Sequence, residues 1–146
     1  MRTRLASFAF IASILAACSG GQQDVALSDE DRMAMPADPV FGQRVFRQCA
    51  VCHEAAQDTG HRQGPNLWAI VGAEAGRHAD FTYSRALKNS GLIWDEATLD
   101  AYIADPQAVV PGTRMGYFGS TSEADRRDII AFLTTLNADA PTDQGR

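Results

Sequence analysis

The sequence predicts an all-α domain. Near the C-terminus, apolar residues recur at positions i, i+3, i+4 and i+7, namely Ile129, Phe132, Leu133 and Leu136. No segment alternates polar and apolar residues as a half-buried strand would, and no internal repeat is present. Glycine-rich segments separate short helical patterns, so we expect the domain to be organised around something other than a large helix bundle.

The N-terminal end, residues 1–17, is predicted to be a secretory signal. Arg2 and Arg4 precede an uncharged apolar run that ends in small residues. This run is shorter than the roughly 20 apolar residues that a membrane-spanning helix needs. Its end, residues 15–18 (LAAC), resembles the lipobox of bacterial lipoproteins, so we expect Cys18 to carry lipid. The alternative is an ordinary signal that leaves Cys18 as a free thiol.

The following segment, residues 18–37, is predicted to be a flexible tether because it is rich in Gly, Gln, Asp and Ser. Met33 and Met35 within it are expected to be solvated and to bind nothing. The domain proper is expected over residues 38–138, with a disordered tail over 139–146.

The charge of the chain excludes one class of partner. Removal of residues 1–17 would leave 11 basic residues against 18 acidic ones, a net charge of −7. An acidic protein without a run of Lys or Arg repels phosphate backbones. We therefore expect no nucleic-acid binding.

Helix signals divide the domain in a regular order. Asp38 and Pro39 suit an N-cap and the first helical position, and this first helix is expected to carry Cys49 and Cys52 near its C-terminal end. The later elements are expected to be a loop over 54–76, a short helix over 84–89 closed by Gly91, a helix from Asp95 that Pro106 ends, a loop through Val110 to Gly119, and a last helix from about Ser122 with Asp125 as its capping-box partner.

The segment CAVCH, residues 49–53, carries the strongest chemical signal. A redox dithiol would need a βαβ context, and a structural zinc site would need a second Cys/His pair, which the chain lacks. In a C-x-x-C-H turn, both thiols can add to haem vinyl groups while the histidine ligates the iron. Lipid on Cys18 and haem on Cys49 and Cys52 would leave none of the three cysteines free. We therefore expect one covalently attached haem c (heme c) with His53 as an iron ligand.

The opposite side of the iron could be closed by a methionine, by a histidine or by solvent. Met115 lies in the loop VVPGTRMGYFG, between a Pro-Gly turn and a further glycine, which could lay its sulfur against a flat ring. His61 and His78 are the only other histidines. From these residues alone, an ordinary core methionine is the more common role for a residue such as Met115.

These segments in combination resemble class I cytochromes c, within them the mitochondrial-type group and its bacterial membrane-anchored lipoprotein relatives. The similarity runs from about Asp38 to Ala138. It is carried, in this order, by GQRVFRQCAVCH, GPNLWAIVG, FTYSRALKNSGLIWDEATLDAYIADP, VVPGTRM and DRRDIIAFL. The resemblance implies the cytochrome c fold, in which short helices and loops wrap around one covalently bound haem.

The resemblance also implies how the haem is held. It assigns Cys49 and Cys52 to thioether bonds, His53 to the proximal position and Met115 to the distal position. It further implies that the Pro65 carbonyl accepts a hydrogen bond from the outer ring N–H of His53, which would fix the tautomer.

Other positions are matched less directly. Tyr83 and Trp94 resemble donors to a haem propionate, and Thr113 resembles a donor to a propionate or a buried water. His61 matches a position that bridges loops, whereas His78 is expected to be a surface residue. Gly42 and Phe46 resemble the contact where the first helix crosses the last at Ile129 and Phe132.

The chain departs from the family pattern in three ways. Ala73 stands where the family usually has an arginine near a propionate, and Leu87 replaces a usual asparagine beside the distal ligand. The lysine ring of mitochondrial proteins is also missing, its positions being taken by Gln107, Ala108, Thr121 and Ser122.

A six-coordinate iron has no open position, so the resemblance implies a one-electron carrier and not an enzyme. By analogy, electrons would arrive from a cytochrome bc complex and leave to a haem-copper terminal oxidase. The protein would be held by lipid at the cell membrane and face the periplasm. The alternative is a dedicated electron-transfer subunit of one periplasmic dehydrogenase or reductase. A ligand-binding or peroxidatic haem protein would require Met115 to leave the iron.

Overall fold

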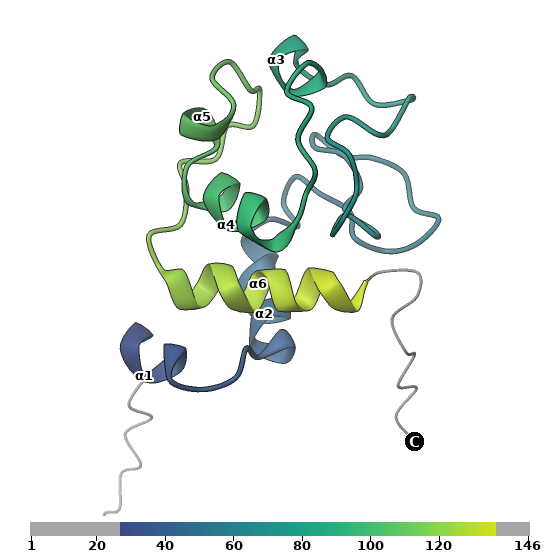
Figure 1. The fold of residues 1–146 in the computed structure, drawn as a ribbon. Coiled ribbons are helices and arrows are strands. Elements are labelled where there is room, and N and C mark those ends of the chain that lie inside the picture. Colours follow the sequence, from purple (N-terminus) through teal and green to yellow (C-terminus); the bar gives the residue numbers. More distant parts are fainter. Residues whose placement is uncertain (1–26, 137–146) are drawn as a thin grey trace, which may run out of the picture.

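The structure, a computed structural model, describes residues 27–136 and shows short helices joined by long loops (Figure 1). The elements are α1 (Asp29–Met33), α2 (Pro39–Val45), the 3-10 helix η1 (Phe46–Gln48), α3 (Arg85–Lys88), α4 (Glu96–Ala104), α5 (Pro106–Val109) and α6 (Glu123–Thr135). Within 27–136 there is no strand, only an isolated antiparallel bridge between Glu74 and Ile93. The predicted all-α class is therefore confirmed for this range.

Three predicted features lie outside the described residues: the signal peptide, the lipidated Cys18 and the tail over 139–146. Between residues 27 and 136, none of the helices has the length and apolar character needed to cross a bilayer.

Side-chain caps set the helix starts. The Asp38 carboxylate accepts the backbone N–H groups of Val40 and Phe41 at 2.9 and 3.0 Å. The same kind of cap opens the other main helices, through Ser84, Asp95, Asp105 and Ser122.

One expected element boundary is wrong, and one helix was not expected. The first helix ends at Val45, and the chain tightens through i to i+3 hydrogen bonds, so Cys49 and Cys52 lie in turns after η1 and not on an α-helix. Pro106 does not only end α4. It also begins α5, because Asp105 caps the next turn and the missing N–H of a proline is tolerated at the first helical position.

The crossing of α2 and α6 is the main contact between the two ends of the domain. A Cβ on Gly42 would collide with the Asp128 carbonyl group, so only glycine allows this approach. Beside it, the Phe46 and Phe132 rings pack with centroids 5.1 Å apart, and Ile129 is 1% exposed. The predicted contact between the first and the last helix is confirmed.

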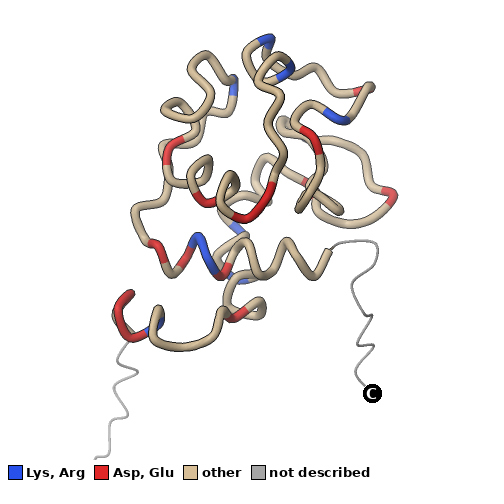
Figure 2. Tube along the Cα trace, in the orientation of Figure 1, with Lys and Arg blue, Asp and Glu red and all other residues tan. Residues whose placement is uncertain are grey.

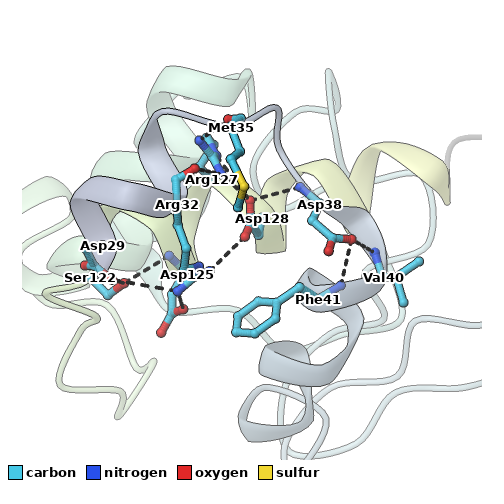
Figure 3. A network of polar contacts seen from close by, with 10 residues as sticks. All are labelled: Asp29, Arg32, Met35, Asp38, Val40, Phe41, Ser122, Asp125, Arg127 and Asp128. Carbon is cyan, nitrogen blue, oxygen red and sulfur yellow. Dashed lines mark hydrogen bonds and ion pairs between the residues drawn. The ribbon is translucent and has the colours of Figure 1, made fainter. Parts of the chain in front are cut away.

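The predicted tether requires a correction, because its last part is folded. Helix α1 lies against α6, as Figure 3 shows. The Arg32 guanidinium binds the Asp125 carboxylate at 2.6 Å and the Asp128 carboxylate at 2.8 Å, and it lies 4.1 Å from the centroid of the Phe41 ring. Composition could not indicate this segment because α1 buries no apolar residue and is held by charges. We call residues 28–37 the strap.

Asp128 is the centre of the strap contacts (Figure 3). Its side chain is 2% exposed, and it also accepts the Asp38 backbone N–H at 3.0 Å and the Arg127 guanidinium at 2.9 Å. Burial alone would raise its pKa, but the hydrogen bonds from Arg32, Asp38 and Arg127 outweigh burial and bring the pKa below the ordinary value. A carboxylate of this kind stabilises the fold above its ordinary pKa. That stabilisation is lost as the pH falls through the lower pKa of the folded state.

We predict that Arg32→Ala lowers the free energy of unfolding at pH 7 by about 2–3 kcal/mol, because two charge-assisted hydrogen bonds to carboxylates are lost. Urea unfolding measures this, with Arg47→Ala as the control, since Arg47 is exposed and donates to the carbonyl of nearby Arg44. The difference between the parent and Arg32→Ala should shrink as the pH falls below the ordinary pKa of an aspartate, about 3.9, towards the lower pKa of Asp128 in the folded protein. Equal stability of the parent and Arg32→Ala, or a difference that does not change with pH, would contradict the assigned contact.

Candidate haem-attachment site

The His53 imidazole is fixed by the loop that follows it. Its Nδ1 lies 2.7 Å from the Pro65 carbonyl oxygen, and since a carbonyl can only accept, Nδ1 carries the proton. The lone pair is then on Nε2, which is the atom that can ligate a metal. Burial lowers the pKa of His53 and outweighs the opposing effect of the Pro65 hydrogen bond. The ring is therefore held neutral and in one orientation.

Gly64 provides the space for this ring. A Cβ at Gly64 would lie 2.7 Å from Nδ1 and 2.8 Å from Nε2 of His53, which is closer than side-chain contacts allow. Two backbone hydrogen bonds join this loop to the segment around His53. The Gly64 N–H donates to the Cys52 carbonyl at 2.7 Å, and the Leu67 N–H donates to the Glu54 carbonyl at 2.8 Å. The segments around His53 and Pro65 are thus joined by backbone hydrogen bonds.

The two cysteines next to His53 are half-buried and unpaired. They sit in one tight turn, where the N–H groups of Cys52 and His53 both donate to the Cys49 carbonyl at 3.0 Å. Burial, with a smaller contribution from Cys52, raises the pKa of the Cys49 thiol to about 11. The thiols are therefore free for thioether formation beside the imidazole.

The loop that carries Met115 is held by polar side chains. The Thr113 hydroxyl lies 2.7 Å from the Tyr102 hydroxyl and accepts the Met115 backbone N–H at 3.3 Å. The Gln107 side chain donates to the Thr113 carbonyl at 2.9 Å and accepts the Gly112 N–H at 3.2 Å. Gln107, which stands where mitochondrial proteins have lysine, thus has a structural task, and sequence reasoning missed both it and Tyr102.

Trp94 and Tyr83, the two expected propionate donors, are buried and half-buried respectively. Trp94 is 6% exposed with its ring 4.8 Å from that of Tyr102, and its indole N–H has no hydrogen-bond partner among residues 27–136. A buried donor without a partner is uncommon in proteins, and an anionic oxygen would satisfy it. Tyr83 is half-buried against Phe81, and burial raises the pKa of its hydroxyl.

Four of the predicted site residues meet at one hydrophobic core, of which Trp94 is a buried member. Cys49, Tyr83 and Met115 all pack against the same cluster of buried side chains. The buried members of this cluster are Phe46, Ile70, Leu87, Trp94, Leu99, Tyr102, Ile103, Val110, Ile129, Ile130 and Leu133. The free thiols of Cys49 and Cys52, the neutral imidazole of His53 that Gly64 makes room for, and the buried Trp94 N–H are groups that suit a covalently attached haem. Cys18 lies outside the described residues.

The other two histidines serve the loop over residues 61–80. The Asn66 backbone N–H donates to Nδ1 of His61 at 2.9 Å, so its Nε2 carries the proton and donates to the Asp80 carboxylate at 3.1 Å. His61 therefore bridges loops. His78 is not merely a surface residue as expected, because it is half-buried, bonds the Asn66 carbonyl at 3.0 Å and packs on the His61 ring.

Arg77 is a further residue that sequence reasoning missed. Its guanidinium donates to the carbonyl groups of Trp68 and Ala69. Burial lowers the pKa of Arg77 while the nearby Tyr83 raises it, so Arg77 and Tyr83 are close enough to interact. The chain therefore has a cation near the predicted propionate donor Tyr83, although Ala73 cannot provide one.

Comparisons with known proteins agree with this geometry. Residues 40–137 match the family model described as Cytochrome c. The chain is 51% identical over 98 residues to cytochrome c2 of Rhodomicrobium vannielii, covering 67% of this chain and 78% of that protein. It is 47% identical over 102 residues to cytochrome c2 of Rhodoblastus acidophilus, covering 70% and 95%. Among solved structures, cytochrome cH from Methylobacterium extorquens is similar, with a TM-score of 0.63, 42% identity and coverage of 67% of this chain and 98% of that one.

We predict that Gly64→Ala lowers the yield of haem-bearing protein severalfold and destabilises the fold by about 1–3 kcal/mol, because the methyl group displaces the His53 ring. Gly60→Ala is the matched control, since a Cβ there meets nothing within 4 Å. Haem-stained gels and thermal unfolding measure the two effects. Similar haem yields for the two variants would refute the role given to Gly64.

Proposed function

The chain belongs to the class I cytochrome c family, and we propose that it passes single electrons between proteins of a bacterial cell envelope through a haem ligated by His53 and Met115. As a family member it has the cytochrome c fold, it is an electron carrier with one covalent haem c, and it is not an enzyme. The observation that carries the proposed iron ligation is the hydrogen bond from Nδ1 of His53 to the Pro65 carbonyl.

Three features of the described residues support ligation by His53 and Met115. The hydrogen bond from Nδ1 of His53 leaves Nε2 free to bind iron. Met115 is half-buried on a loop that Thr113 holds through the Met115 backbone. His61 and His78 use ring nitrogens in hydrogen bonds within the loop over 61–80, which removes them as competing ligands. When bound, the haem supplies the one-electron chemistry of its iron.

Other side chains of the site would position and neutralise the group. Cys49 and Cys52 would hold it covalently, and the Trp94 indole, the Tyr83 hydroxyl and Thr113 would face its acidic groups. Arg77 would add the positive charge that burial of a carboxylate requires. Their common task is to make one polar edge of a cofactor compatible with an apolar core.

Residues 1–37 support a place at the periplasmic face of the cell membrane. We propose that a signal peptide is removed before a lipidated Cys18, and that the strap marks where the folded domain starts. Residues 18–27 would then reach at most about 35 Å from the lipid. By analogy with the family, electrons would come from a cytochrome bc complex and leave to a haem-copper terminal oxidase.

The charge distribution suggests why the protein would be tethered to a membrane. Acidic residues gather around α1 and the N-terminal parts of α4 and α6 (Figure 2), and the lysine ring is missing. The protein therefore does not attract its redox partners through a positively charged surface. Confinement to one membrane surface can raise the effective concentration of a partner to about millimolar, so that weak contacts suffice.

We predict that Met115→Ala makes the reduced protein bind carbon monoxide at neutral pH and lowers its potential by on the order of 0.1 V, because the thioether ligand that favours ferrous iron is lost. Visible spectroscopy and a redox titration measure these changes. Met35→Ala, an exposed methionine on the strap, should leave both properties unchanged. Parent protein that already binds carbon monoxide, or a Met115→Ala variant with the parental potential, would exclude Met115 as the ligand.

We predict that Cys18→Ser, exported with a non-lipoprotein signal, moves the haem protein from the membrane fraction to the soluble periplasmic fraction. Oxygen consumption that depends on the protein should fall at least about tenfold at equal expression, because the effective concentration at the membrane is lost. Fractionation and oxygen electrode measurements on cells that express either form test this. Unchanged respiration with the soluble form would show that electron transfer does not depend on the tether.

A further inference from the structure

Residues 114–119, here called the Met115 segment, are held by side chains and not by their own backbone. Within residues 27–136, no backbone-to-backbone hydrogen bond joins this segment to another part of the chain. The Met115 N–H donates instead to the Thr113 hydroxyl, at 3.3 Å. Segments with few hydrogen bonds to the rest of a fold open locally at a lower free-energy cost than helices do. The side chains that close this segment therefore decide how firmly Met115 is held.

Gln107 closes the N-terminal side of the Met115 segment. In the turn over residues 110–113 (VPGT), the Thr113 N–H donates to the Val110 carbonyl at 2.9 Å. Gly112, the third residue of the turn, has φ of 87°, which a type II turn requires and glycine allows. The Gln107 side chain donates to the Thr113 carbonyl at 2.9 Å and accepts the Gly112 N–H at 3.2 Å. One side-chain amide thus fixes the turn that leads into the segment.

Helix α5 fixes the position of Gln107 itself. The Asp105 carboxylate caps this helix by accepting the backbone N–H groups of Gln107 and Ala108, both at 3.1 Å. Pro106 is buried at the first helical position. Because the backbone of Gln107 is held in this way, its side chain restrains the turn over 110–113 instead of moving with it.

Tyr117 closes the C-terminal side of the Met115 segment. Its hydroxyl donates to the side-chain oxygen of Gln48, one residue before Cys49, at 3.2 Å. Burial raises the pKa of Tyr117, so the hydroxyl keeps its proton and remains a donor at neutral pH. Beyond the segment, the Ser120 N–H donates to the Ile103 carbonyl at 2.9 Å. Tyr117 therefore joins the segment to the turn that carries the two cysteines.

Apolar packing leaves the Met115 segment only partly covered. Met115 is half-buried against the core, and Gly116 next to it is exposed and has no side chain to pack. On the other side, Arg114 is exposed and its guanidinium donates to the Thr82 carbonyl. Loss of one further contact would therefore loosen the segment without detaching it, since the Arg114 contact remains.

We propose that Gln107 and Tyr117 are positioning residues that keep Met115 on the haem iron by holding the two sides of the Met115 segment closed. The proposal rests on the proposed ligation by Met115 and specifies what controls it. An external ligand reaches the iron only in molecules in which Met115 has left it. The apparent affinity for such a ligand is therefore proportional to the fraction of molecules in which the segment is open.

The experiment measures imidazole binding to the ferric holoprotein by visible spectroscopy. Gln107→Ala removes both hydrogen bonds to the turn, whereas Gln107→Glu keeps the acceptor for the Gly112 N–H and loses only the donor. Tyr117→Phe removes only the hydroxyl. We expect the apparent dissociation constant to fall at least about tenfold in Gln107→Ala and about threefold in each of the other two variants. Gln107→Ala combined with Tyr117→Phe should give about the product of the single effects, because the contacts lie on opposite sides of the segment.

Two control variants separate positioning from general damage. Gln43→Ala, at an exposed glutamine on α2, should leave the imidazole affinity within about twofold of the parent. Arg32→Ala should do the same although it destabilises the whole domain, because Arg32 acts at the contact between α1 and α6. Before imidazole is added, the visible spectrum should be the same in every variant, since Met115 remains the ligand in most molecules.

Two results would overturn the positioning roles while leaving Met115 as the ligand. The first is equal imidazole affinity in the parent, Gln107→Ala and Tyr117→Phe, with a much higher affinity in Met115→Ala. The second is an Arg32→Ala variant that gains as much affinity as Gln107→Ala, because the effect would then follow overall stability. If the parent binds imidazole as tightly as Met115→Ala does, the proposed ligation itself fails, and the positioning roles fail with it.

Discussion

The hydrogen bond between the His53 ring and the Pro65 carbonyl is the constraint on which the rest of the structure depends. It joins the turn after η1 to a loop that has no helix of its own between Gln48 and Arg85. Gly64 lets the loop approach closely enough, and Asn66 keeps it in shape through bonds to the neighbouring loop segments. A long loop is thereby ordered around one imidazole, which is the condition for a metal ligand with a single orientation.

Helix α2 connects the segment around His53 to the strap. The Asp128 carboxylate binds Arg32 of the strap and the backbone of Asp38, the residue that caps α2. Helix α2 then crosses α6 at Gly42 and continues through η1 into the cysteine turn. The folded end of the N-terminal segment and the haem-attachment turn are thus held by the same helix pair.

The features that sequence could predict are those with local causes. Asp38, Ser84, Asp95 and Ser122 cap helices through bonds to residues two or three positions away, so the starts of these four helices were visible in the chain. The chemistry of CAVCH is also local, because five consecutive residues contain both thiols and the imidazole.

The features that sequence missed depend on long-range contacts. Arg32 and Asp128 are 96 positions apart, and α1 has no buried face to signal that it is folded. His78 gains its partners only when the loop over 61–80 closes on itself. Gln107 was noted only as a missing lysine, whereas its contacts with the Met115 loop require α5, which the sequence did not reveal.

The central claim, that a haem is bound covalently in the turn beside His53, is tested most directly by mass spectrometry of the tryptic peptide from Gln48 to Arg62. The account predicts that this peptide from the purified exported protein has the added mass of one haem, absorbs visible light and has no cysteine that can be alkylated. An unmodified peptide with both cysteines alkylated would contradict the account.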